Sequence, residues 1–506
     1  MRPYILLLVA GLLVRVGLAL LAEHPGLFDP NHYYNLARNL AEGRGFVVDY
    51  IWQYHQKPTA VTHPVDYRMP LAAVWPALSM RVLGIGLLPA LLPNIVFSTA
   101  LVAFTGLIAR VARLSRSAEL MAMALILFLP DFVLGAVRTD TTVSYALFCG
   151  MALLCLYRGM QDRPWLLALA GACGALAQLT RLDGVLLLPA LLIGALLLRR
   201  FGERPVPWRW LLALPLAWTL VLSPWLWRNQ QDLGTLWPAG PGNTPFLTHF
   251  DDQFSYSQEH NLESFLAWGP ANILKNIAFH SLANLNVMVT TQGFALPLLA
   301  LLGLGGWLRQ RHRGRLQLLC TPLLFLLALY GVYSVILPFH SMGGSFKKSW
   351  LALIPFLAVA GAWALDAYLR PRRMGQVAAI LIAGFMLMQA IQLVRSEYTL
   401  VADRLEERRK VAAIVESLGD QNGDGQVILM TDAPFFMNWM GYKAVMIPND
   451  DRDTILHVAR RYAADMILMP ALRDALWPLY DGSESDERLP LLGRSSHSRL
   501  YGITEA

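Results

Sequence analysis

Long apolar blocks alternate with short basic links along most of the chain. The apolar residues run without interruption, which is not the three-and-four spacing of a half-buried helix. Each block approaches the roughly 20 residues that a helix needs to cross a bilayer. We therefore predict an α-helical polytopic membrane protein with about eleven transmembrane helices. The predicted spans are 4–22, 87–110, 119–136, 143–160, 165–180, 184–199, 210–227, 291–308, 316–338, 351–369 and 374–394.

The arginines mark one side of this predicted bundle. If the N-terminus is cytoplasmic, every short basic link falls on the cytoplasmic side. Positive residues resist translocation, so this agreement supports both the spans and their direction. We expect a multi-pass protein of the cell inner (plasma) membrane, with the first block retained as a helix although Arg15 interrupts it. The basic links are 110–118, 158–164, 199–209, 309–315 and 370–373.

The long polar segments fall on the opposite side of the membrane. They are the outer loops 23–86 and 228–290 and the tail from residue 395. The tail changes character, because short strand-like runs alternate with amphipathic helical stretches. We predict a transmembrane domain over 1–394, which includes both outer loops, and a small extracytoplasmic α/β domain over 395–506. The predicted strands of the tail are 426–430, 444–447 and 465–469, with a helix near 452–463.

Composition agrees with a membrane protein and excludes two other classes. The chain is 55% hydrophobic and only 15% charged, far from the balance of a soluble domain. The net charge of +7 is concentrated in the links between spans, so we expect no nucleic-acid partner. The four cysteines lie in or beside apolar segments without a CxxC pair, so we expect neither a disulfide nor a zinc site.

Two carboxylates on the outer side stand next to predicted spans. Asp29 follows the first span, and Asp140 lies in a very short link between two spans. A base at this depth is suited to deprotonate an acceptor hydroxyl as it attacks a lipid-linked sugar. Each residue is also well placed to cap the helix that follows it. Position alone leaves both roles open.

Basic residues on the outer side form a second group of candidates. A leaving lipid phosphate needs its charge neutralised, and arginine does this with two parallel hydrogen bonds. The alternatives are contact with lipid headgroups and ion pairing with nearby acids. We assign every member except Arg181 to the donor phosphate. The group comprises Arg68, Arg138, Arg181, Arg228, Lys347 and Lys348.

Several of these residues stand in recognisable patterns. Asp29 precedes Tyr33-Tyr34-Asn35-Leu36-Ala37-Arg38, Arg68 precedes Met69-Pro70-Leu71, and a later span ends in Pro224-Trp225 followed by Arg228-Asn229. In these motifs the chain resembles the GT-C superfamily of membrane glycosyltransferases, above all the family 39-like protein O-mannosyltransferases and lipid A aminoarabinose transferases. The resemblance runs from residue 1 to about 240, and the tail from 395 is similar to the small outer domain of bacterial members.

The resemblance implies a role for each candidate. Asp29 would be the catalytic base, Asp140 a second carboxylate that orients the acceptor or assists, and Arg68 and Arg228 would hold the donor phosphate. Many members carry two adjacent acids where this chain has Asp29-Pro30, which argues against a metal-binding acidic pair.

The implied reaction is an inverting transfer of a hexose or pentose from a polyprenyl-phosphate donor to a hydroxyl of a glycan, lipid or protein. It passes through an oxocarbenium-like state and requires no external cofactor. Assistance from a divalent cation is left open.

Three other functions compete with this hypothesis. A transporter or lipid flippase predicts ionisable residues within the spans and broken spans in two matching halves. The sequence shows few acids within spans and no such symmetry. A membrane scaffold would have no need of Asp29 and Asp140. An oligosaccharyltransferase or glycan polymerase would use similar chemistry, and the small tail argues by analogy against a large oligosaccharyltransferase.

Overall fold

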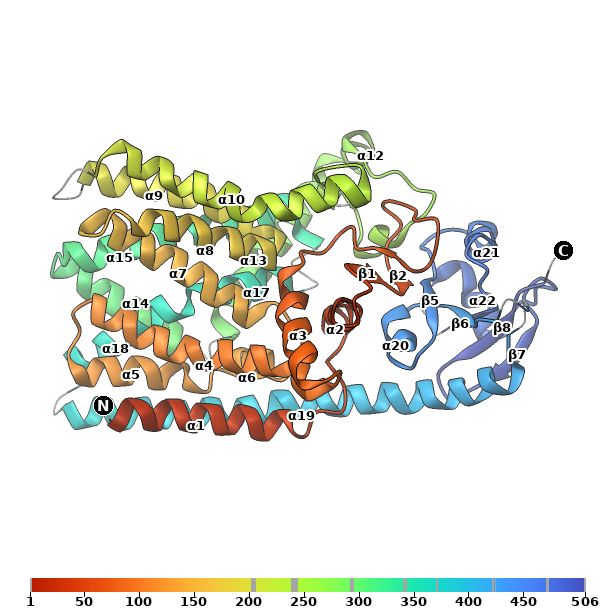
Figure 1. The fold of residues 1–506 in the computed structure, drawn as a ribbon, viewed down its shortest axis with the longest axis horizontal. Helices are drawn as coiled ribbons and strands as arrows, with labels where there is room; N and C mark the ends of the chain where they lie inside the picture. Colours follow the sequence, from red (N-terminus) through yellow and green to blue (C-terminus); the bar gives the residue numbers. More distant parts are fainter. Residues whose placement is uncertain are drawn as a thin grey trace. The chain divides into compact units, whose positions relative to one another are not determined.

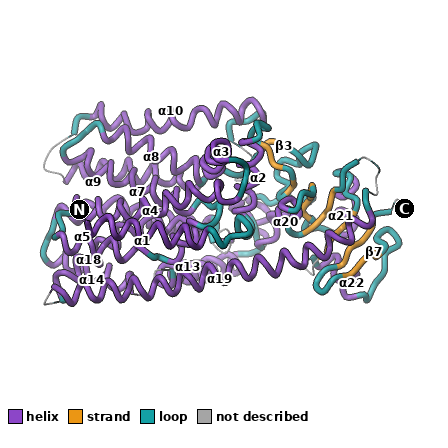
Figure 2. Tube along the Cα trace, turned by 60° about the horizontal axis from the view of Figure 1, so that its bottom comes forward, coloured by secondary structure: helices purple, strands orange, loops and turns teal. Residues whose placement is uncertain are grey.

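A computed structural model describes most of the chain, and its residues fall into two compact units. The helical unit comprises Met1–Glu23, Arg68–Arg228 and Ala271–Ser396, and the sheet unit comprises His24–Tyr67, Asn229–Pro270 and Glu397–Ala506. Long helices make up the helical unit, and the strands gather in the sheet unit (Figure 1, Figure 2). The described residues are 2–201, 206–237, 244–291, 295–339, 344–369, 372–420, 423, 425–469 and 473–504.

The helical unit is built from apolar helices that pack closely on one another. Helix α7 packs on α8, α14 packs on α18, and α18 also packs on α4 and α5. The helices up to α10 are α1 (Arg2–Ala19), α3 (Leu71–Leu83), α4 (Leu87–Val111), α5 (Arg116–Leu127), α6 (Pro130–Ala136), α7 (Thr142–Gln161), α8 (Leu166–Thr180), the 3-10 helix η1 (Leu182–Leu186), α9 (Leu187–Phe201) and α10 (Trp208–Leu233).

The second half of the unit adds further apolar helices and a short π-helix. Helices α10 and α19 both begin in this unit, and the last residues of each belong to segments of the sheet unit. These elements are α13 (Pro270–Thr290), α14 (Ala295–Arg309), α15 (Arg313–Gly331), the π-helix η4 (Val332–Ile336), α17 (Ser345–Trp350), the 3-10 helix η5 (Leu351–Leu353), α18 (Ile354–Tyr368) and α19 (Arg372–Leu418).

The predicted class, a polytopic helical membrane protein, is confirmed, and the number of spans differs from the prediction. In the described part of the chain, eight helices are long and apolar enough to cross a bilayer, or up to ten if each of two bent pairs is one span. The predicted span 119–136 is such a pair, since α5 and α6 meet at 62°. Pro130 opens α6, and a proline disfavours helical backbone in the residue before it. The predicted span 165–180 forms α8, which has only 15 residues.

One predicted loop contains a long helix instead. Residues 228–290 were expected to form an outer loop, and Pro270–Thr290 forms the apolar helix α13. Its sequence mixes asparagine and histidine with leucine and valine, so its mean hydropathy is too low to stand out along the chain. Packing in the helical unit gives these polar side chains partners, as Asn284 donates to Ser334 Oγ at 3.1 Å.

Arg15 lies in the apolar helix α1 and is fully buried and hydrogen-bonded. Its guanidinium donates to Ser98 Oγ on α4 at 2.7 Å, to the Leu127 carbonyl on α5 at 3.0 Å and to the Gly11 carbonyl at 2.9 Å. A charge within an apolar bundle is costly unless it is paired or hydrogen-bonded. Arg15 therefore connects α1 to α4 and α5.

The sheet unit contains a six-stranded sheet in the order β2-β5-β4-β6-β8-β7. The first four strands run parallel, and β8 and β7 complete the sheet as antiparallel strands. The predicted runs at 426–430, 444–447 and 465–469 correspond to the central strands. The strands are β2 (Tyr50–Ile51), β4 (Ile428–Thr431), β5 (Lys443–Met446), β6 (Met466–Met469), β7 (Leu491–Arg494) and β8 (Arg499–Gly502), and a separate pair joins β1 (Val47–Val48) to β3 (His63–Pro64).

The sheet unit is larger than the predicted tail domain, because segments from two predicted outer loops belong to it. Strand β2 comes from the segment between α1 and α3 and forms the edge of the sheet beside β5. The Tyr54 hydroxyl, just beyond β2, donates to the Met446 carbonyl of β5. A strand of two residues is too short to show an alternating pattern, so this pairing could not be predicted from the residue pattern. The tail contributes α20 (Pro434–Trp439), α21 (Arg452–Arg461) and α22 (Trp477–Asp481).

A glycine at the contact of α14 with α18 provides a test of the helical packing. A Cβ atom added to Gly303 would lie 2.0 Å from the Ala360 carbonyl oxygen, so the two backbones approach too closely for any side chain. We expect Gly303→Val to lower the free energy of unfolding by about 1–3 kcal/mol or more. Melting temperature in detergent measures the effect.

The matched control lies on the same helix. Gly305 is exposed, and a Cβ atom there would meet nothing within 4 Å. Gly305→Val should therefore leave the melting temperature unchanged. Equal effects of the two substitutions would show that helix propensity, not the α14–α18 contact, explains the loss.

Candidate active site

Seven charged residues come together in the helical unit from four separate elements, and we call them the charged cluster. Asp131 lies on α6, Arg138 and Asp140 lie between α6 and α7, Arg181 and Asp183 lie at the start of η1, and Lys347 and Lys348 lie on α17. Ion pairs bring together Asp131 with Lys347, Asp140 with Arg138 and Lys348, and Asp183 with Arg181. The cluster thus joins links that are far apart in the sequence.

Asp140 is the most enclosed carboxylate of the charged cluster, since its side chain is 0% exposed. Arg138 Nη2 lies 2.9 Å from Asp140 Oδ2, and Lys348 Nζ lies 3.1 Å from Oδ1. The Thr141 backbone N–H also donates to Oδ1, at 2.6 Å. A carboxylate that accepts bonds from several donors holds those donors in place. Asp140 therefore fixes the positions of two cations.

Asp183 makes the second centre of the charged cluster. Arg181 donates to it twice, through Nε at 3.2 Å and through Nη2 at 3.1 Å. Tyr333 of the π-helix η4 donates its hydroxyl to Asp183 Oδ2 at 2.6 Å, and Ser349 of α17 donates to the same oxygen. Arg181 and Asp183 are nearly buried, with 9% and 6% of their side chains exposed. Single turns of π-helix often occur at functional sites.

Thr141 connects these two centres through its hydroxyl. Arg181 Nη1 donates to Thr141 Oγ1 at 3.2 Å, and Thr141 Oγ1 donates to Asp140 Oδ1 at 3.2 Å. Asn94 of α4 supports the same link, because its amide donates to the carbonyls of Arg138 and Asp140 at 2.8 and 2.9 Å. The α6–α7 link is therefore held from both sides, and Asp140 and Asp183 share one hydrogen-bonded network through Thr141 and Arg181.

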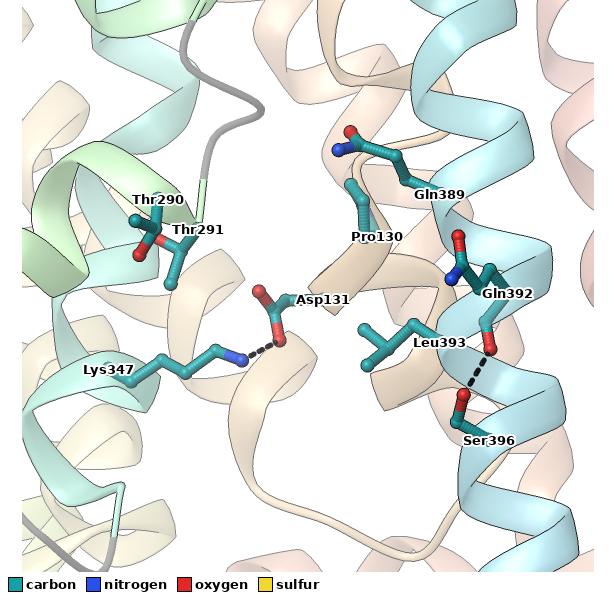
Figure 3. Close-up of a pocket in the computed structure, with 9 residues that line it drawn as sticks. All are labelled: Pro130, Asp131, Thr290, Thr291, Lys347, Gln389, Gln392, Leu393 and Ser396. Atoms are coloured by element: carbon teal, nitrogen blue, oxygen red, sulfur yellow. Dashed lines mark hydrogen bonds and ion pairs between the residues drawn. The ribbon is translucent and has the colours of Figure 1, made fainter.

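The two neighbouring lysines of α17 contact different acids. Lys348 pairs with Asp140, and Lys347 Nζ lies 2.7 Å from Asp131 Oδ1. The pair of Lys347 with Asp131 lines a pocket, which Figure 3 shows together with its other side chains. Two consecutive residues of a helix point in different directions, which explains why the lysines divide between two carboxylates.

Arg68 and Arg228 stand where the chain passes between segments of the two units. Arg68 lies just before α3 and is partly buried. Arg228 lies on α10, with its guanidinium carbon 4.8 Å from the centre of the Trp225 ring. This cation–π contact, between residues three apart on one helix, orients the arginine.

Asp29 belongs to the sheet unit, where it is the first residue of α2 (Asp29–Ala41) and is partly exposed. Phe28, directly before it, has a φ of 55°, which is unusual for a residue other than glycine. Strained backbone of this kind often accompanies functional sites. The segment before it is fixed by Glu397 Oε1 of α19, which accepts from the Leu27 N–H at 3.3 Å.

Neither Asp29 nor Asp140 is the N-cap residue of the helix that follows it. The N-cap residue of α2 is Phe28, and the N-cap residue of α7 is Thr141. Asp29 still stands in the first turn of its helix, where the partial positive charge of the helix end favours a carboxylate. Asp140 lies two residues before α7, directly before the N-cap residue, and pairs with two cations.

A buried carboxylate, Asp49, holds α2 to the rest of the sheet unit. Asn35 and Asn39, both on α2, donate to Asp49 Oδ2 at 3.0 and 2.9 Å, and Arg44 Nη1 lies 3.2 Å from Oδ1. Burial by itself would raise the pKa of Asp49, but the hydrogen bonds from Asn35 and Asn39 and the charge of Arg44 outweigh burial and lower that pKa below its usual value. The charged form of Asp49 therefore stabilises the position of α2.

Among the residues that the structure describes, no group of three or more histidine, cysteine, aspartate and glutamate side chains is arranged to hold a metal ion. The carboxylates of the charged cluster are each engaged by arginine or lysine.

The sequence prediction left out two acids of the charged cluster. Asp183 stands two residues after Arg181 in a short outer link, so its position beside a candidate cation was a usable signal. Asp131 lies inside the predicted span 119–136. The sequence pattern does not show the bend between α5 and α6, which places Asp131 in the first turn of a separate helix. Its partner Lys347 is more than 200 residues away, so no local pattern connects them.

Comparison with known proteins identifies the fold. Residues 62–227 match the family model for dolichyl-phosphate-mannose-protein mannosyltransferases, and this segment is about a third of the chain. It contains Asp131, Arg138, Asp140, Arg181 and Asp183 of the charged cluster. None of the curated proteins matches the chain at a significant level.

Solved structures match almost the whole chain at low identity. ArnT from Cupriavidus metallidurans bound to undecaprenyl phosphate matches with a TM-score of 0.59 and 12% identity, over 98% of this chain and 97% of that one. Its apo state matches with a TM-score of 0.55 and 13% identity, over the same shares. An oligosaccharyltransferase from Archaeoglobus fulgidus in the apo form matches with a TM-score of 0.56 and 12% identity, over 92% of this chain and 69% of that one. The chain has the GT-C fold, so the resemblance in its motifs is confirmed at the level of the fold.

The Asp49 network predicts a pH-dependent stability. Because the folded-state pKa of Asp49 is lowered, its contribution is present above the unfolded pKa of about 3.9 and is lost as the pH falls through the folded value. We expect Asp49→Asn to lower the melting temperature at pH 7 by roughly 4–8 °C. The difference from the wild type should shrink as the pH falls below about 4. A pH-independent difference would contradict this assignment.

Proposed function

We propose that the protein is an inverting glycosyltransferase that moves a sugar from a polyprenyl-phosphate donor to an acceptor hydroxyl on the extracytoplasmic face of the inner membrane. The observation that carries the proposal is the charged cluster in a GT-C fold. Four cations from three separate links meet there beside enclosed carboxylates. Gathering such charges in an apolar helical protein is costly, and ionisable groups kept in this way commonly serve a function.

The charged cluster supports binding of the donor phosphate. Arg138 and Lys348 are held on either side of Asp140, so their donors are pre-oriented before a ligand arrives. Lysine and arginine donors in a site of low exposure stabilise the negative charge that develops on a leaving phosphate. We assign these two residues to the phosphate, with Arg68 and Arg228 as further donors. The relative ArnT was solved with undecaprenyl phosphate, which supports a polyprenyl carrier for this protein as well.

The two acids then have different roles. The side chain of Asp140 is 0% exposed, forms ion pairs with Arg138 and Lys348, and accepts a hydrogen bond from the Thr141 N–H, so the carboxylate is already engaged. We propose that Asp140 positions the phosphate-binding cations. Asp29 is partly exposed at the start of α2, and a base must reach the acceptor proton, so we propose Asp29 as the base.

In the proposed reaction the acceptor oxygen attacks the anomeric carbon of the donor sugar. The bond from that carbon to the phosphate oxygen breaks as the new glycosidic bond forms, which inverts the configuration. The acceptor proton passes to the Asp29 carboxylate, and the bond electrons leave with the polyprenyl phosphate. The reaction balances without a metal ion or an organic cofactor. The donated sugar is a hexose or a pentose, and the acceptor is a glycan, a lipid or a protein.

This function requires a defined orientation in the bilayer. We propose a cytoplasmic N-terminus, since the short arginine-rich links then share the cytoplasmic side. If the two bent pairs and the short apolar helix α8 each cross the bilayer, the number of crossings is odd. The tail and the α6–α7 link would then lie on the extracytoplasmic side, where lipid-linked sugars are presented to envelope glycans.

The base assignment is tested by Asp29→Asn. We expect turnover to fall by about 100- to 10,000-fold while donor binding persists, because the amide cannot accept the acceptor proton. The assay measures release of polyprenyl phosphate from a panel of polyprenyl-phosphate sugars, with membrane extract as the source of acceptor.

Asp453→Asn is the matched control, since Asp453 belongs to the same unit and 82% of its side chain is exposed. It should retain full turnover. Normal turnover by Asp29→Asn would remove Asp29 from the reaction. Binding of donor sugars without release of polyprenyl phosphate from any of them, even by the wild type, would favour a transporter or flippase.

The phosphate assignment is tested by Lys348→Met. We expect the Kd for the donor to rise by about 10- to 100-fold, as a charge-assisted bond is lost. The exposed Lys410, which pairs with Glu406 in the other unit, supplies the control Lys410→Met.

A double substitution tests whether Lys348 binds the donor phosphate or only neutralises Asp140. If Lys348 acts on the donor, Lys348→Met with Asp140→Asn should bind donor as weakly as Lys348→Met alone. Recovery of wild-type affinity in the double variant would mean that Lys348 serves only to balance the charge of Asp140.

A further inference from the structure

A pocket of about 370 Å³ lies within the helical unit beside the charged cluster. Figure 3 shows side chains from α6, α13, α17 and α19 around it. Most of the lining is polar, which is unusual for a space between apolar helices. The polar lining residues are Asp131, Thr290, Thr291, Lys347, Gln389, Gln392 and Ser396.

Helix α19 contributes a polar stripe to this pocket. Gln389, Gln392 and Ser396 follow one another at spacings of three and four, so they lie on one face of the helix. The neighbouring Met388 and Ile391 are apolar and exposed, at 58% and 46%. An apolar helix that carries two amides on one face requires polar partners there.

One atom of this polar stripe lacks a hydrogen-bond partner among the described residues. The Oε1 atom of Gln389 is buried and accepts no hydrogen bond from the described residues. A buried acceptor without a donor is rare in native proteins, and a missing ligand is one explanation. In Figure 3 the Gln389 amide lies above Pro130, and Gln392 lies one turn further along α19. A ligand that donates hydrogen bonds would satisfy this atom.

The charge of the pocket limits the ligand to a neutral one. Asp131 and Lys347 are its only charged lining residues among those described, and they pair with each other at 2.7 Å. A phosphate would need an excess of positive charge. Amides and hydroxyls both donate and accept hydrogen bonds, as the hydroxyls of a sugar or polyol do.

We propose that this pocket binds the neutral, hydroxyl-rich headgroup of a membrane lipid, a sugar or a polyol. The apolar chain of the lipid lies along the exposed flank of α19 at Met388 and Ile391. This assignment rests on the proposed function. The bound headgroup is then either that of the acceptor glycolipid or the sugar of the lipid-linked donor. Lys347 and Lys348 are adjacent, so the pocket adjoins the cations assigned to the donor phosphate.

Binding is measured without turnover, so the result does not depend on the proposed reaction. The full chain is purified in dodecyldimethylamine oxide, which carries no sugar. Native mass spectrometry then follows a titration with dodecyl β-maltoside, and dodecyl phosphate serves as the charged probe of equal chain length. We expect saturable binding of the maltoside in preference to the phosphate.

The variants assign that binding to the pocket. Gln389→Leu with Gln392→Leu removes both amides and should raise the Kd for the maltoside by about tenfold. Ser396→Phe should weaken binding independently by filling the space. The control Gln376→Leu alters an exposed glutamine of the same helix outside the pocket, where it donates to Ser117 Oγ, and should bind normally.

Several outcomes would overturn the proposal. They are an absence of maltoside binding to the wild type, equal binding by all variants, and preferential binding of dodecyl phosphate that the pocket variants weaken. Steady-state turnover then distinguishes the two sources of the headgroup. A raised KM for acceptor alone in the double glutamine variant identifies an acceptor glycolipid, and a raised KM for donor alone identifies the donor sugar. Failure of turnover in the wild type would count against the proposed function and leave the binding result standing.

Discussion

The helical unit depends on one constraint, which is that every charge among its apolar helices needs a partner. The hydrogen-bonded path from Asp183 through Arg181 and Thr141 to Asp140 meets this constraint. Each ion pair in it comes from a short link between helices, where the backbone is free to turn inward. Removing one partner of an enclosed pair leaves a charge uncompensated, which costs several kcal/mol in typical proteins. These ion pairs and hydrogen bonds therefore hold the links in place.

The same constraint divides the region around α17 into two parts of different chemistry. Lys348 joins Arg138 at Asp140, where positive groups are concentrated. Lys347, the preceding residue, is neutralised by Asp131, and the pocket beyond this pair is lined by amides and hydroxyls. An enzyme that acts on a lipid-linked sugar has to bind a charged phosphate and neutral hydroxyls close together. Under the proposed function, the two consecutive lysines of α17 point toward these two environments, Lys348 to the charged one and Lys347 to the neutral one.

In the sheet unit, the position of α2 depends on segments that are distant in the sequence. Asp49 binds two asparagines of α2, and Asn35 also donates to Asn438 of α20 at 2.8 Å. Strand β2 pairs with β5, which comes from the tail. The first residue of α2 is Asp29, so the tail sheet and the Asp49 network together fix the backbone that carries the proposed base. A tail of this kind has a structural role beside any part it plays in recognition.

The sequence by itself determined the class of the protein, because an apolar block long enough to cross a bilayer is a local property of the chain. The strands of the tail and the candidate residues Asp140, Arg138 and Lys348 were also visible, since each stands in or beside a short segment with a clear pattern. The pairing of Asp131 with Lys347, the role of Asp183, the polar stripe of α19 and the edge strand β2 were decided only by the tertiary structure. The spacing of the α19 stripe is local, but the pocket that it faces and the other three features depend on contacts between segments up to several hundred residues apart. Neither hydropathy nor spacing records which distant side chain will meet a buried charge.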